Sequence, residues 1–126
     1  MNEEAMLDTL VAIEREQAMG QRLGFDMSNW YNDTMSECGT TACLAGWAAI
    51  QAGWKPAANV SSVVYAEKDG RMELWPQVGA GVLGLDEREA DALFYEPESL
   101  GEVYAAVAEI SGVAEDVWRD KVRGRV

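Results

Sequence analysis

The stretch Cys38–Trp54, which reads CGTTACLAGWAAIQAGW, decides the fold. A hydroxyl of Thr40 or Thr41 can accept a backbone N–H of a first helical turn, so we expect the helix cap there. The helix then spans about 41–52 and ends before a glycine. Gln51 is its only strongly polar side chain, and a helix that is apolar all round is a buried one. The other elements are therefore expected to surround this helix.

Helical periodicity and capping residues predict further helices along the chain. The first, over 3–18, has a cap at Asn2 and is followed by a short helix capped by Asp26 or Ser28. Later helices are expected from Trp75-Pro76 to about Gly84, from Asp86 to about Phe94, and over 98–111 and 113–122.

One segment favours strands instead of helices. Residues 59–67 are rich in β-branched side chains, Lys68-Asp69-Gly70 is a tight-turn signal, and 71–74 can return as a second strand. We expect a small hairpin near 60–74, and we interpret Trp54-Lys55-Pro56 before it as a break in regular structure. The predicted fold is mainly α (α+β): one globular domain over 1–126, with five to six helices around the central one.

Composition excludes several classes of function. The chain of 126 residues has 22 acids, 10 bases and a net charge of −12, which disfavours binding to the nucleic acid backbone. It has no histidine, which excludes Ser-His-Asp or Cys-His catalysis within the chain and zinc sites that use imidazole. No catalytic motif, cofactor or metal site is indicated, so we favour a protein that is not an enzyme. An acidic N-terminus and the lack of a long apolar run predict a cytoplasmic protein without a membrane contact.

The polar turn before the central helix is the first candidate site. Free N–H groups and hydroxyls at a helix head can hold an anion, and a thiol there can become reactive. Aromatic side chains nearby could stack on a base or sugar. The alternative is that the threonines only cap the helix and the cysteines are structural. The candidate ligand-binding residues are Trp30, Tyr31, Cys38, Gly39, Thr40, Thr41 and Cys43.

An acidic run over 86–102 is the second candidate site. It holds seven acids and one base, Arg88, and on helices it would form a negative face for a basic partner, or one that mimics DNA phosphates. A solvated helix face is the simpler interpretation. The candidate partner-binding residues are Asp86, Glu87, Asp91 and Glu98.

The pattern Cys38-Gly39-Thr40-x-x-Cys43-x-Ala45-Gly46-Trp47, preceded by Phe25-Asp26-Met27-x-x-Trp30, resembles a family of small uncharacterised proteins of actinobacterial phages and their hosts. The similarity continues at Leu83-Gly84-Leu85, Glu89-Ala90 and Leu93-Phe94-Tyr95. It implies a phage accessory protein inside a bacterial cell, and it implies no activity or site residue.

Three functions remain open from the sequence. The first is a non-enzymatic phage accessory protein that binds a host or defence component, either a protein or a small nucleotide-like signalling molecule. The second is an acidic protein-interaction or DNA-mimic inhibitor, and the third is a thiol-dependent enzyme or redox protein using Cys43 or Cys38. A homo-oligomer would also fit, since aromatic side chains adjoin predicted turns.

Overall fold

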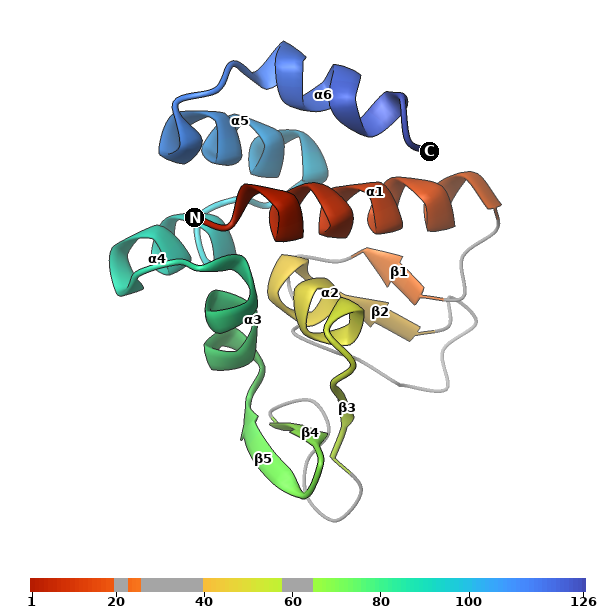
Figure 1. The fold of residues 1–126 in the computed structure, drawn as a ribbon, viewed down its shortest axis with the longest axis vertical. Helices are drawn as coiled ribbons and strands as arrows, with labels where there is room; N and C mark the ends of the chain where they lie inside the picture. Colours follow the sequence, from red (N-terminus) through yellow and green to blue (C-terminus); the bar gives the residue numbers. More distant parts are fainter. Residues whose placement is uncertain (20–22, 26–39, 58–64) are drawn as a thin grey trace.

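The computed structural model describes residues 1–19, 23–25, 40–57 and 65–126. Within these ranges the chain is mainly helical, with a parallel pair of strands and a three-stranded antiparallel sheet (Figure 1). The helices are α1 (Glu3–Met19), α2 (Leu44–Gln51), α3 (Trp75–Leu83), α4 (Glu87–Phe94), α5 (Leu100–Ser111) and α6 (Glu115–Arg123). The strands are β1 (Leu23–Phe25), β2 (Thr40–Ala42), β3 (Lys55–Pro56), β4 (Tyr65–Lys68) and β5 (Arg71–Leu74).

Helix α2 is the buried helix that the sequence predicts, but it begins later. Six consecutive residues from Leu44 to Ala49 are buried. The expected threonine cap is wrong: Thr40 and Thr41 lie in β2, which pairs in parallel with β1, and Cys43 is the N-cap residue without a side-chain cap hydrogen bond. An extended backbone that pairs with β1 cannot also form the first turn of a helix, so α2 starts at Leu44.

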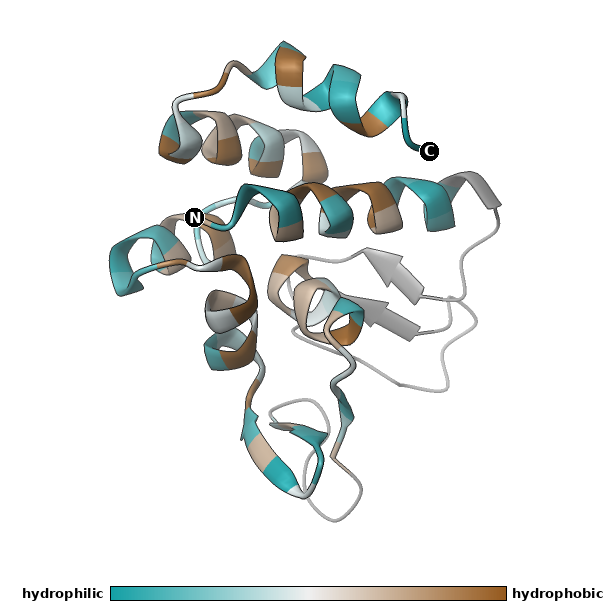
Figure 2. Cartoon of the chain, in the orientation of Figure 1, coloured by the Kyte–Doolittle hydropathy of each residue, from teal (hydrophilic) through white to brown (hydrophobic). Residues whose placement is uncertain are grey.

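Helix α1 lies between α2 on one side and the α5–α6 pair on the other (Figure 1). Met6, Leu10 and Ile13 are fully buried, whereas Asp8 and Arg15 are exposed. Figure 2 shows the same division along α5, whose hydrophobic side faces the interior. The main core joins α1 and α2 to Leu83, Leu93, Tyr104 and Trp118 from the later helices.

The helix ends agree with the local sequence signals. The Oδ1 of Asn2 accepts a hydrogen bond from the N–H of Ala5 at 3.1 Å, so Asn2 caps α1 as expected. Asp86 and Glu89 form a reciprocal capping box at the start of α4. Gly84 and Gly112 have φ of 64° and 74°, and each ends a helix in the left-handed conformation. The short helix expected after Asp26 or Ser28 lies outside the described residues.

The hairpin is confirmed in its described part, and a third strand joins it. Residues 58–64, where the first strand is expected to begin, lie outside the described residues. Strands β4 and β5 pair antiparallel around the turn Asp69-Gly70, where both residues have positive φ. The expected break at Lys55-Pro56 is wrong, because these residues form β3 and pair with Glu67 and Ala66 of β4. An edge position tolerates Pro56, since its missing N–H can lie on the open side of the sheet. Ala66 of this sheet, together with Trp54 just before β3, packs against Trp75 and Val78 of α3.

Candidate functional site

The predicted ligand-binding turn is described only in part. Trp30, Tyr31, Cys38 and Gly39 lie outside the described residues. Thr40 and Thr41 belong to β2, so they do not form the head of a helix. Ligand binding at these two residues stays a prediction.

Cys43 lies inside the main core, between β2 and α2. Its side chain is 0% exposed, and it is surrounded by the apolar residues of the cluster. A substrate or redox partner reaches this thiol only when the fold opens locally. The burial therefore favours a structural role over the thiol chemistry expected for Cys43.

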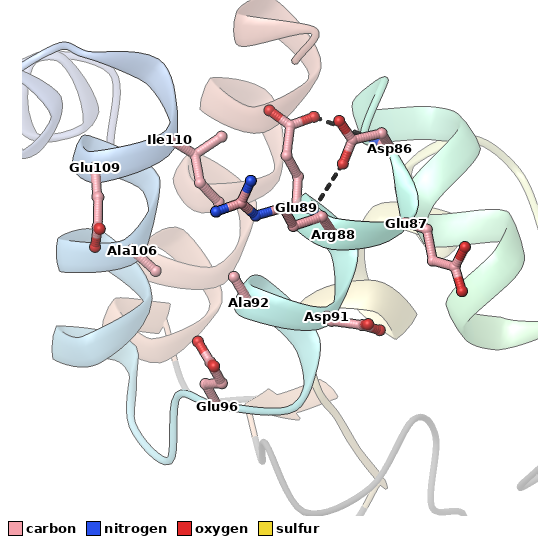
Figure 3. Close-up of a pocket in the computed structure, with 10 residues that line it drawn as sticks. All are labelled: Asp86, Glu87, Arg88, Glu89, Asp91, Ala92, Glu96, Ala106, Glu109 and Ile110. Atoms are coloured by element: carbon pink, nitrogen blue, oxygen red, sulfur yellow. Dashed lines mark hydrogen bonds between the residues drawn. The ribbon is translucent and has the colours of Figure 1, made fainter.

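The acidic run lies beside a hollow between α4 and α5 (Figure 3). The hollow has a volume of about 910 Å³. Its apolar lining is made by small or aliphatic side chains, Ala92 from α4 and Ala106 and Ile110 from α5. The polar lining has one base, Arg88, and six acids. The acids are Asp86, Glu87, Glu89, Asp91, Glu96 and Glu109. We call this hollow the acidic groove.

The packing of α4 determines which acids face solvent. Leu93 and Phe94 enter the core, which turns the opposite side of the helix outward. The Glu89 carboxylate accepts a hydrogen bond from the N–H of Asp86 at 3.1 Å, and the Asp86 carboxylate accepts one from the N–H of Glu89 at 2.8 Å. Both carboxylates therefore cap the start of α4. Figure 3 shows Glu87 and Asp91 on the side of α4 away from α5.

The other two groove carboxylates come from outside α4. Glu96 follows α4 in the chain, and Glu109 lies on α5. In Figure 3 Glu96 lies near the gap between α4 and α5, and Glu109 lies on α5; both are on the opposite side of α4 from Glu87 and Asp91. Since both are exposed, a ligand in the groove can contact them directly.

The groove carboxylates form no ion pair with a basic side chain in the described part of the chain. In the described part of the chain, the ion pairs are Arg119–Glu115, Arg123–Asp120 and Arg125–Asp8, and none of these lines the groove. Several like charges around one hollow add their potentials and attract cations from solution. The groove can therefore bind a positively charged group while its apolar lining contacts an alkyl chain.

Three of the four predicted partner-binding residues line this groove. Asp86, Glu87 and Asp91 line it, whereas Glu98 does not; the N–H of Glu98 donates to Glu102 at 2.9 Å at the start of α5. Glu109 is missed because it lies thirteen residues beyond Glu96. Its spacing of three from Ala106 is the only sequence signal, and it indicates a shared helix side without saying which element faces that side.

A smaller hollow lies beside α1. It has a volume of about 390 Å³ and is lined by residues of α1, α2 and α3 and by Arg125. Arg15 donates to the carbonyl oxygen of Arg125, and the Arg125 guanidinium lies 3.8 Å from Asp8. These contacts hold the end of the chain against α1, so we interpret this hollow as part of the packing of the C-terminal residues.

The described residues contain no group of three His, Cys, Asp or Glu side chains arranged to hold a metal ion. None of the described helices combines the length and the apolar character needed to cross a bilayer. Comparisons with protein-family models, curated protein sequences and solved structures found no match to this chain. The resemblance to small phage proteins therefore stays a prediction.

Proposed function

We propose that the protein is a non-enzymatic binding protein whose acidic groove binds a basic segment of a partner protein. The observation that carries the proposal is the groove itself, a hollow of about 910 Å³ with six acids and one base in its lining. A Lys or Arg side chain has an aliphatic stem and a cationic end. Such a side chain can place its stem on Ala92 and Ala106 and its charge beside Glu96 or Glu109.

The setting of this binding also follows from the sequence predictions. If the chain is a phage accessory protein, the partner is a basic host or defence protein in the bacterial cytoplasm. A protein surface rich in Lys and Arg is also the kind that binds DNA phosphates. A partner that binds the groove through such a surface would therefore fit both the protein-interaction and the DNA-mimic interpretations. Binding of a nucleotide-like molecule at Trp30 and Tyr31 stays a prediction, because these residues lie outside the described ones.

A defined peptide tests whether the groove, rather than total charge, makes the interaction. The probe is a fluorescein-labelled peptide of about ten Lys and Arg residues, followed by fluorescence anisotropy. Glu96→Lys/Glu109→Lys reverses the two groove acids that lie on the α5 side of α4, and Glu87→Lys/Asp91→Lys reverses those on the side of α4 away from α5. We expect at least one of these variants to weaken binding about tenfold or more, since a tenfold change corresponds to about 1.4 kcal/mol.

The matched control is Asp116→Lys/Asp120→Lys on α6. It changes the net charge by the same amount, and it repeats the four-residue spacing of Glu87 and Asp91 at exposed positions outside the groove. We expect the control to weaken binding less than about threefold, because Asp116 and Asp120 are outside the groove lining and salt at 0.1 M screens exposed charges over about 10 Å. Equal losses in all variants would show attraction by total charge and would reject the groove as the site.

A second arm examines the DNA-mimic form of the proposal. Once a basic partner is known, duplex DNA is added to its complex with this protein. Competition by DNA indicates that the groove covers the partner's phosphate-binding surface. If binding is unchanged in excess DNA, the DNA-mimic hypothesis is rejected, and binding of a basic segment in the groove is kept.

A further inference from the structure

Strand β5 has an exposed edge. The sheet order is β3-β4-β5, so within the described residues β5 has a strand neighbour on one side only. Arg71, Met72 and Glu73 are all exposed, and the Met72 side chain is 50% exposed. Figure 1 shows β5 at an outer edge, at the end of the molecule opposite α5 and α6. An edge of this kind presents backbone N–H and C=O groups to another strand.

The turn determines which backbone groups face outward. Asp69 and Gly70 have φ of 52° and 79°, as in the two-residue turns that close right-handed hairpins. Lys68 and Arg71 are then the hydrogen-bonded closing pair, and bonded pairs alternate with non-bonded ones along the ladder. The N–H and C=O of Met72 therefore point away from β4.

The side chains of β5 are complementary to a second copy of the same strand. Arg71 and Glu73 lie two residues apart, so they share one face of the sheet. When two β5 strands run antiparallel with Met72 at the centre, Arg71 lies opposite Glu73 of the second copy, twice in each dimer. A register centred on Glu73 would place two carboxylates opposite each other, which is unfavourable. The charges therefore select the Met72-centred register, which also uses the outward groups of Met72.

The other face of the hairpin adds apolar surface to the same contact. Tyr65 and Met72 are among the large hydrophobic residues that are exposed, at 36% and 50%. Glu67 lies opposite Met72 and two residues from Tyr65, so Tyr65 and Met72 are on one face. Pairing through Met72 brings the two Met72 side chains together and extends this face across both molecules.

We propose that the protein forms a symmetric dimer through antiparallel pairing of two β5 strands centred on Met72, joining two three-stranded sheets into one. The occupant of the edge is a second copy of this chain. The acidic groove lies on α4 and α5, away from this edge, so the dimer leaves it accessible.

Charge swaps test the register directly, with analytical ultracentrifugation as the measurement. Arg71→Glu places Glu opposite Glu, and Glu73→Arg places Arg opposite Arg, so each variant alone turns two attractions into two repulsions. We expect each to raise the dimer dissociation constant at least about tenfold, given the size of cross-strand pair energies. An equimolar mixture of the two variants restores opposite charges at both positions, and we expect it to dimerise within about threefold of the wild type.

Several outcomes overturn the proposal. A wild-type chain that stays monomeric at millimolar concentration rejects the dimer, and single variants that dimerise normally place any interface elsewhere. The Arg71 guanidinium also lies over the Trp54 ring, 5.5 Å from its centroid, and Arg71→Glu removes this contact. Circular dichroism therefore checks whether that variant is folded. If that variant is unfolded, Glu73→Arg alone tests the register. Its dimerisation must be weak at low salt and must recover when salt screens the repulsion between opposed arginines. No recovery rejects the register.

Discussion

Gly79 gives a stability prediction whose sign is set by helix packing. It lies in α3 where this helix crosses the buried α2. A Cβ added at Gly79 would lie 2.8 Å from both the Cα and the Cβ of Ala45, and 2.9 Å from its carbonyl oxygen. Two of these atoms are backbone, so they cannot rotate away. Gly79→Ala therefore forces α2 and α3 apart.

The magnitude follows from two opposing contributions. Replacing glycine by alanine inside a helix stabilises it by about 1 kcal/mol. Overpacking a close core contact costs about 1–3 kcal/mol. Gly81 provides the control in the same helix, because an added Cβ there has nothing within 4 Å. We expect Gly79→Ala to lower the free energy of unfolding by up to about 2 kcal/mol and Gly81→Ala to raise it by up to about 1 kcal/mol.

Urea denaturation followed by tryptophan fluorescence measures both variants. The difference between the two midpoints isolates the contact with Ala45, since helix propensity changes equally in both. Ala45→Gly in the Gly79→Ala background removes one of the close atoms and is expected to recover part of the loss. If Gly79→Ala is as stable as Gly81→Ala, the close approach of α2 and α3 is not a feature of the native protein, and the packing argument fails.

Two further predictions concern buried groups. The Tyr104 hydroxyl donates to Glu14 at 3.3 Å, and burial, followed by the charge of that carboxylate, raises the pKa of the phenol well above its ordinary value of about 10. The unfolded chain therefore loses this proton first, so the free energy of unfolding should fall as the pH rises above about 10, and Tyr104→Phe should reduce this fall in urea titrations at pH 9 and 11. In a Cys38→Ser variant, we expect Cys43 to react with a thiol reagent only as fast as the fold opens, because its side chain is 0% exposed. Rapid labelling under native conditions would contradict that burial.

The parts of the fold that depend on neighbouring residues could be predicted from the sequence. Asp86 and Glu89 form a capping box through their spacing of three, which is readable without tertiary structure. The turn at Asp69-Gly70 and the apolar character of α2 are local in the same sense. These signals correctly place the hairpin and the central helix.

The errors arise where a distant segment competes with a local signal. Thr40 and Thr41 have the composition of a helix cap, but they pair with Leu23 and Gly24, seventeen residues earlier in the chain. Pro56 is a residue type that usually interrupts regular structure, yet in β3 it pairs with Ala66 of β4. Pairing of this kind depends on where the chain returns in space, which propensity cannot show.

The candidate site shows the same limit. The sequence reveals a dense run of acids, and three of its four selected residues line the groove. It could not reveal that α5 forms the second wall, since that wall depends on how α4 and α5 pack. Glu109 is therefore recognised as a groove residue only from the tertiary structure, which also shows that Glu98 is not in the groove lining.

The net charge of −12 relates the two proposed contacts through salt. Added salt screens the attraction between the acidic groove and a basic segment, so that binding must weaken. Two copies of this chain repel each other at long range, and salt reduces this repulsion while it also weakens the local Arg71–Glu73 pairs. Backbone hydrogen bonds and Met72 contacts at β5 are much less sensitive to salt. Dimerisation should therefore depend on salt far less than groove binding does, and the two contacts can be separated in one titration series.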